Sequence, residues 1–213
     1  MALFKKPIPF AISREEIYEL GKRLQNQEQR ALFYTLYVTG ARVSEALQIP
    51  KRDIQREIQN GREVCRFTVM TLKKKSGNAS PRGLSVPIEG IEGEMVKEIL
   101  SYWDNIKEPD TRLFHYSRTR VWNLFSHLRV DIRAVTPEKE FVDLLGFKIH
   151  PHYLRHCRAT HFAVYWGWNN PYDFMKWFGW EDANRPMTYI QLDWKDWLKK
   201  FPAAGMSNSE QVG

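Results

Sequence analysis

Histidine and arginine side chains gather in one short segment of this sequence. His152-Tyr-Leu-Arg155-His156 begins an apolar stretch that we expect to form a helix. Residues three positions apart lie on one face of a helix, so the imidazole of His152 can stand beside the guanidinium of Arg155. An arginine binds phosphate oxygens through paired hydrogen bonds, and a neighbouring imidazole can transfer a proton there. The segment therefore indicates acid–base chemistry at a phosphate.

The same segment offers a zinc site as an alternative. Four of the six histidines lie within twelve residues, namely His150, His152, His156 and His161. His152 and His156 are four apart and could both face one metal ion. Against this, Cys157 is the only nearby thiol, close acidic residues are few, and a cation fits poorly beside Arg155 and Arg158. We therefore predict a site with no metal and no other cofactor, and keep zinc as the weaker alternative.

A second candidate is the run Thr39-Gly-Ala-Arg42-Val-Ser-Glu45, which we place where one helix ends and the next begins. Such a junction directs free backbone N–H groups and a guanidinium toward one spot, an arrangement that suits an anion. The alternative is a plain ion pair between Arg42 and Glu45 across one helix turn. The sequence leaves both readings open.

A third candidate lies near the C-terminus, where Phe-Gly-Trp180 precedes Tyr189 by nine residues. The chain contains eight tryptophans, and packing in the core explains most of them. By its position alone, Tyr189 is equally well a core tyrosine.

A mostly helical fold must position these residues. Ser13 followed by Glu16 is a helix N-cap and a candidate capping box. Apolar periodicity predicts helices at about residues 14–25, 28–38, 42–47, 93–105, 118–129, 153–166, 171–178 and 185–190. Alternating β-branched and aromatic residues predict strands at 64–72 and 83–88, joined by a lysine-rich loop at 73–82. We expect a short amphipathic stretch at 195–201 and a flexible tail at 202–213. The predicted class is mainly α with a small antiparallel β-sheet (α+β).

The charge is positive and uneven. Lys and Arg number 32 against 25 Asp and Glu, a net charge of +7 over 213 residues. Basic residues concentrate at 51–90 and again at 112–133, which is typical of a nucleic-acid surface. A solvated face that serves solubility is the alternative.

Other classes of protein fit this sequence poorly. It has no apolar run of about 18 residues for a membrane helix and no apolar stretch near Met1 for a secretory signal. Glycine-rich nucleotide loops are missing as well. Cys65 and Cys157, the two cysteines of the chain, are far apart in the sequence, which suits reduced thiols in a cytoplasmic protein. We predict a cytoplasmic, DNA-associated protein.

Considered together, the three candidates and the basic hairpin resemble the tyrosine recombinase (phage integrase) family. The order is Arg42, a lysine hairpin ending in Ser-Val-Pro-Ile, His152-x-x-Arg155, Trp180 and then Tyr189. The resemblance covers about residues 13–194. Where the family usually has Leu-Gly-His, this sequence has Phe-Gly-Trp, as in the branch in which tryptophan fills that position.

The resemblance implies that the chain cuts and rejoins duplex DNA without metal or ATP. Tyr189 would attack a phosphodiester and form a 3′-phosphotyrosyl bond, with His152 as its base or as a partner that holds the proton. Arg42 and Arg155 would bind the non-bridging oxygens, and Trp180 would add one indole N–H bond.

The resemblance also implies a lysine in the hairpin that protonates the leaving 5′-oxygen. We favour Lys73 for this role, with Lys74 as the runner-up. Glu45 and His156 match family positions that mainly hold the catalytic residues in place.

The resemblance implies a single catalytic domain at 1–201, without the N-terminal DNA-binding domain that family members usually carry before it. The partner would be double-stranded DNA, and the segment 194–201 could dock on a neighbouring copy to form a homo-oligomer on DNA. Two rivals are a type IB topoisomerase that relaxes supercoils and a catalytically silent DNA-binding protein with the same fold.

Overall fold

The computed structural model describes residues 11–72, 77–135 and 141–190. Its helices are α1 (Arg14–Lys22), α2 (Gln27–Thr39), α3 (Val43–Ala46), α4 (Gly90–Asp104), α5 (Arg118–Ser126), α6 (Pro151–Val164) and α7 (Pro171–Phe178). Its strands are β1 (Ile54–Gln59), β2 (Arg62–Thr71), β3 (Ser80–Pro87), β4 (Arg129–Val135) and β5 (Phe141–Lys148). Two 3-10 turns are η1 (Lys51–Asp53) and η2 (Pro186–Thr188). The fold is mainly helical with small antiparallel sheets, which confirms the predicted class.

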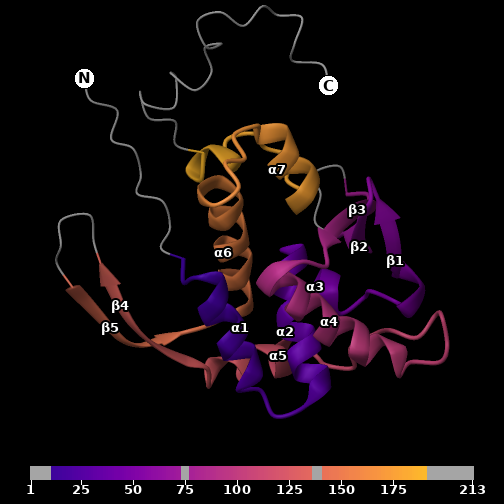
Figure 1. The fold of residues 1–213 in the computed structure, drawn as a ribbon, viewed down its shortest axis with the longest axis horizontal. Helices are drawn as coiled ribbons and strands as arrows, with labels where there is room; N and C mark the ends of the chain where they lie inside the picture. Colours follow the sequence, from indigo (N-terminus) through magenta and orange to yellow (C-terminus); the bar gives the residue numbers. More distant parts are fainter. Residues whose placement is uncertain (1–10, 73–76, 136–140, 191–213) are drawn as a thin grey trace, which may run out of the picture.

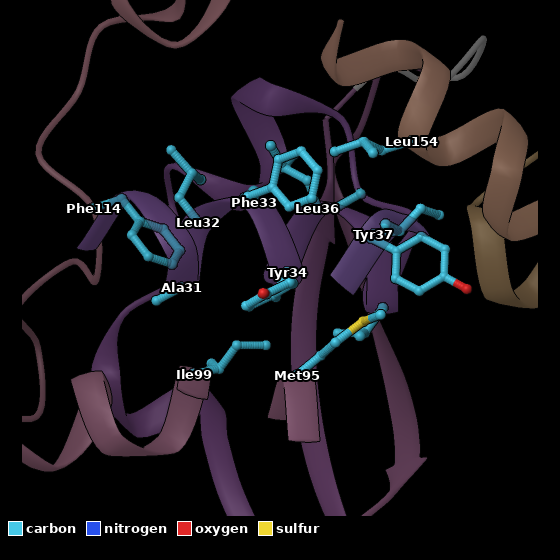
Figure 2. Close-up of a cluster of buried hydrophobic side chains, with 14 of the residues drawn as sticks. Ala31, Leu32, Phe33, Tyr34, Leu36, Tyr37, Met95, Ile99, Phe114 and Leu154 are labelled. Atoms are coloured by element: carbon cyan, nitrogen blue, oxygen red, sulfur yellow. The ribbon is translucent and has the colours of Figure 1, made fainter. Parts of the chain in front are cut away.

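The core is built around α2. Every side chain of this helix from Ala31 to Thr39 is buried, as expected of a helix surrounded by other elements. Figure 2 shows Leu32, Phe33, Tyr34 and Leu36 of α2 within a cluster that includes Met95 and Ile99 of α4, Phe114 and Leu154. Burying one such apolar side chain contributes about 1.5–3 kcal/mol. This core fixes the end of α2, where the second candidate begins.

The start of α1 carries the predicted capping box. The backbone N–H of Glu16 donates to Ser13 Oγ at 3.1 Å, and the N–H of Ser13 donates to the Glu16 carboxylate at 2.7 Å. A cap of this kind stabilises a helix by about 1 kcal/mol because it satisfies N–H groups that the first turn leaves unpaired. The prediction is confirmed.

The hairpin sheet has three strands instead of the two predicted. The order is β1-β2-β3, with both pairs antiparallel, and Val69 of β2 lies opposite Arg82 of β3. β1 was not predicted because its residues are mostly polar and exposed. A signal was present in the Asn60-Gly61 turn, where both residues have positive φ, as tight hairpins require.

A second hairpin, formed by β4 and β5, was not predicted at all. We expected a helix over 118–129, but α5 ends at Ser126 and β4 begins at Arg129. Residues 129–148 are rich in Val, Ile, Leu and Phe, which favour strands, and we overlooked their alternation. In Figure 1 this hairpin and the three-stranded sheet lie on opposite sides of the helices.

Near the C-terminus, the expected helix at 185–190 is wrong. The structure has a single 3-10 turn there, in which the N–H groups of Tyr189 and Ile190 both donate to the carbonyl of Pro186. The polar segment before Pro186 has no apolar stripe to continue a helix. None of the described helices is long and apolar enough to cross a membrane.

Candidate active site

The site is built where the C-terminal ends of α2 and α7 meet. Gly40 ends α2 and Gly179 ends α7, and both adopt left-handed φ angles of about 60° that glycine tolerates best. A Cβ on Gly40 would stand 2.4 Å from the ring of Phe178, so the two helix ends approach too closely for any other residue. The residues just beyond these glycines, Arg42 and Trp180, are two of the predicted site residues.

Arg155 joins the two helix ends from α6. Its side chain is buried, and its Nη1 and Nη2 donate to the carbonyls of Gly40 at 2.5 Å and Phe178 at 2.6 Å. Burial and the charge of Arg42 lower its pKa to about 9, which leaves it charged near neutrality. The guanidinium also lies 5.4 Å from the ring centroid of Trp180. Arg155 is therefore a fixed cation whose two anchoring bonds leave further N–H groups for an anion.

Glu45 lies at the centre of a group of three arginine side chains. Its carboxylate is fully buried and accepts from Arg42 Nη1 at 2.7 Å, the Arg42 backbone N–H at 2.9 Å and Arg82 Nη2 at 2.9 Å. Arg155 Nη1 lies 4.0 Å away. Burial alone would raise the pKa of Glu45, but Arg82 and the bonds from Arg42 outweigh it and hold the pKa below its usual value. The predicted ion pair between Arg42 and Glu45 is confirmed, and it belongs to a group in which three guanidiniums surround one carboxylate.

Arg82 is the site residue that the sequence analysis missed. It lies on β3, is 8% exposed, and donates from Nη1 to Thr71 Oγ1 at 2.6 Å. A signal was available, since Arg82, Leu84 and Val86 alternate along the strand and all three are buried. We had assigned Arg82 to the loop, so its place on the buried face of a strand was not considered.

Tyr189 stands beside Trp180 and His156. Its ring stacks on the indole of Trp180 with centroids 5.8 Å apart, and its hydroxyl is hydrogen-bonded to Nδ1 of His156. Tyr189 is only 5% exposed, and burial raises its pKa to about 12. The hydroxyl is therefore protonated in the free protein, with an imidazole nitrogen as its partner.

His152 lies on the outer side of this group. It is exposed, and its ring meets that of His156 edge-on with centroids 4.6 Å apart. Partial burial, His156 and Arg155 lower its pKa. His152 also lines an open hollow of about 680 Å³ together with Arg42, Arg118 and Trp122. His152 is therefore exposed whereas Arg155 is buried, although the sequence predicted both on one helix face. The histidine in contact with Tyr189 is His156.

The structure brings together seven of the predicted site residues. These are Arg42, Glu45, His152, Arg155, His156, Trp180 and Tyr189. Lys73 and Lys74, like the segment 194–201, lie outside the described residues. Within the described ranges, no group of three or more His, Cys, Asp or Glu side chains is arranged to hold a metal ion.

Comparison with known proteins identifies the family. The phage integrase family matches residues 12–195 of this chain. The chain belongs to the phage integrase family. Among relatives of this integrase-family chain, the tyrosine recombinase XerC of Erythrobacter litoralis (strain HTCC2594) is 26% identical over 172 residues, which cover 74% of the chain and 47% of the relative. The tyrosine recombinase XerA of Thermococcus onnurineus (strain NA1) is 25% identical over 164 residues, 73% of the chain and 49% of the relative.

Solved structures share the fold. XerH site-specific recombinase bound to its difH substrate aligns with a TM-score of 0.60 and 16% identity, covering 94% of this chain and 55% of that one. The Tn1549 transposon integrase in complex with transposon right end DNA aligns at 0.55 and 12% identity, covering 94% and 67%. The integrase-family chain spans about half the length of the XerC and XerA relatives.

Proposed function

We propose that this chain carries the catalytic site of a site-specific DNA recombinase. It cuts and rejoins duplex DNA through a 3′-phosphotyrosyl bond to Tyr189, and uses neither metal nor ATP. The observation that carries the proposal is the placement of a buried tyrosine hydroxyl against an imidazole, next to a carboxylate surrounded by three arginines. Membership of the phage integrase family and the likeness to recombinases solved with DNA support it.

In the proposed reaction, the Tyr189 oxygen attacks the phosphorus of a DNA phosphodiester. A bond forms from that oxygen to phosphorus, and the bond from phosphorus to the 5′-oxygen breaks. Negative charge grows on the non-bridging oxygens, where Arg42 and Arg155 donate hydrogen bonds and Trp180 adds its indole N–H. Rejoining reverses these steps with a 5′-hydroxyl as the nucleophile, so the bond energy is conserved and no nucleotide is consumed.

Two proton transfers accompany the bond changes. His156 takes the proton of Tyr189, because its Nδ1 is already the partner of that hydroxyl. Burial together with the charges of His150 and Arg155 lowers the pKa of His156, so its ring is neutral and able to accept a proton at pH 7. The leaving 5′-oxygen takes a proton from Lys73, or from Lys74 as the alternative. His152 faces the hollow beside Arg42 and contacts the phosphate from that side.

The duplex lies over the hollow next to Arg42. Arg118 and Trp122 of α5 line this hollow with His152, and Trp122 is 52% exposed and stacked on His150. A cation and an exposed aromatic ring beside the reacting phosphate suit a nucleic-acid surface. The basic segments of the sequence therefore bind the DNA backbone on both sides of the site.

The test is to incubate the full chain with a nicked suicide duplex, from which the cleaved 5′ end diffuses away. Wild type is expected to give a covalent protein–DNA band on a denaturing gel, and Tyr189→Phe is expected to give none. Tyr172→Phe, at an exposed tyrosine of α7, is the matched control and should react like wild type. A band that survives Tyr189→Phe would show that another residue is the nucleophile. Plasmid relaxation by wild type without recombination of paired sites would favour a topoisomerase instead.

A further inference from the structure

We propose that Arg82 is a positioning residue for strand cleavage: by holding Glu45, it sets the guanidiniums of Arg42 and Arg155 where they meet the phosphate. The inference rests on the proposed function. It concerns a residue on β3 that no sequence motif singled out, and it assigns that residue a role in the reaction, without contact to DNA.

The contacts of Arg82 link three elements. Its Nη2 donates to Glu45 Oε2 of α3 at 2.9 Å, and its Nη1 donates to Thr71 Oγ1 at the end of β2 at 2.6 Å. Gly179, at the end of α7, packs directly against this pair. A Cβ at that position would stand 2.6 Å from Thr71 Oγ1 and 3.1 Å from Arg82 Nη1. One guanidinium therefore fixes the hairpin sheet, Glu45 and the corner that leads into Trp180 relative to one another.

Arg82 is bonded to the oxygen of Glu45 that lies nearer Arg155. One carboxylate faces three guanidiniums, from Arg42 before α3, Arg82 on β3 and Arg155 on α6. Arg42 Nη1 donates to Oε1, whereas Oε2 accepts from both Arg82 Nη2 and the backbone N–H of Arg42. Without Arg82, Oε2 keeps only the bond from the Arg42 backbone N–H, so it can shift toward Arg155, 4.0 Å away, and compete with the Gly40 and Phe178 carbonyls for that guanidinium.

The charge of Glu45 also depends on Arg82. Burial favours the neutral carboxyl, and Arg82 is the strongest of the influences that lower the pKa of Glu45. Removing Arg82 therefore raises this pKa, so that Glu45 takes up a proton at a higher pH and releases its hold on Arg42. Arg82 itself is buried with both terminal nitrogens engaged, so it acts through Glu45 and does not touch the phosphate.

The experiment compares Arg82→Gln with wild type in single-turnover covalent adduct formation at saturating suicide duplex. We expect the rate to fall at least about tenfold, while the Kd for the duplex changes less than about threefold. The acid limb of the pH–rate profile should move to higher pH. Arg56→Gln is the matched control, because Arg56 lies on β1 of the same sheet and pairs with Asp104 at the surface, and it should leave rate and profile unchanged.

A double-variant cycle separates this role from plain support of the fold. If Arg82 acts through Glu45, the Arg82→Gln and Glu45→Gln double variant reacts no more slowly than Glu45→Gln alone. Arg82→Lys keeps the charge and should recover part of the rate, and its rate decides the matter if Arg82→Gln fails to fold in a thermal unfolding scan. Additive losses, or an Arg82→Gln rate equal to wild type, overturn the inference. A wild-type chain that forms no adduct overturns the proposed function and this inference with it.

Discussion

Tyr189 is held in a state that cannot react by itself. Its hydroxyl is buried, protonated and bonded to His156, and its ring is stacked on Trp180. A phenol with a pKa of about 12 needs a base at neutral pH, and the neighbouring imidazole is the candidate in contact with it. The family resemblance implied His152 as the base of Tyr189, or as a partner that holds the proton. The contact with His156 changes that assignment in our proposal, because the tyrosine approaches α6 one turn further along the helix.

Replacing His156 tests this assignment through pH. The pKa of His156 lies below its ordinary value of 6.5, so the neutral ring that accepts a proton persists below that pH. For wild type we expect adduct formation to keep its rate as pH falls to 6.5, with the midpoint of the acid limb below that value. His156→Asn should react about a hundredfold more slowly. Its remaining rate should rise steadily toward high pH, where hydroxide can remove the proton of Tyr189.

The measurement is the single-turnover rate across a range of pH for both proteins. His115→Asn, at an exposed histidine far from the site in sequence, is the control and should follow the wild-type profile. If His156→Asn keeps the wild-type rate and profile while His152→Asn loses both, the base is His152, as the sequence first suggested.

At the scale of the elements, helix ends were easier to predict than strands. The Ser13 capping box and the glycine that ends α2 are local signals, and both appear where the sequence placed them. β1 has no apolar face to reveal it, and β4 and β5 form a hairpin of consecutive strands whose alternation of residue types was not recognised. Arg82 is an example: because it was predicted to lie in a loop, its bond to Glu45 was not expected.

A buried histidine connects α6 to α2 and to the segment before α1. Nε2 of His161 on α6 is bonded to the carbonyl of Ile12 at 2.9 Å, and its Nδ1 to the hydroxyl of Tyr37 on α2 at 2.8 Å. In the tautomer that satisfies both partners, Nε2 donates and Nδ1 accepts. Burial lowers the pKa of His161 to about 4, because a charged ring would lose water without gaining a carboxylate. His161 is thus a structural histidine, one of the six that the sequence alone could not separate from site residues.

His161 is expected to make the fold sensitive to acid. Below the ordinary pKa of 6.5, the unfolded chain takes up a proton on this ring, whereas the folded chain does so only near 4. Stability therefore falls as pH drops from 6.5 to 4, by about 3 kcal/mol for this one group. Urea unfolding of wild type and His161→Gln at pH 7, 6, 5 and 4 measures the effect. The variant should start less stable but lose less on acidification; parallel losses in the two proteins would assign the acid sensitivity to other groups.

At the scale of the whole molecule, the structure has a second hollow away from the candidate active site. It has a volume of about 520 Å³ and lies between α6 and α7 on one side and β3 with the start of α4 on the other, and its aromatic lining is Phe162, Trp166, Trp168 and Trp177. Arg14 Nε, Arg158 Nε and Trp177 Nε1 line it as buried donors that have no hydrogen-bond partner among the described residues. We propose that the predicted docking segment 194–201 of a neighbouring copy, which contains Trp194 and Trp197, binds there in assemblies on DNA.

Changing that segment in the full chain tests the assembly without touching the reaction. Trp194→Ala with Trp197→Ala is expected to abolish complexes of more than one copy on DNA, seen by sedimentation, because large aromatic anchors dominate such interfaces. Adduct formation on a single site should stay within about threefold of wild type. Trp166→Ala, on the receiving side, should give the same result, and Tyr172→Ala, exposed outside the hollow, should not. Unchanged assembly in the first two variants would exclude this docking.

The sequence by itself determined the helical class, the family resemblance and most residues of the site. Those residues lie in short motifs, and local spacing suffices to detect them: Arg42 and Glu45 within one turn, and His152, Arg155 and His156 within another. The tertiary structure decided which side chains touch. It placed Arg82 against Glu45 across 37 positions of sequence and Tyr189 against His156 across 33. Such contacts depend on how sheets and helix ends pack together, and local periodicity carries no information about that packing.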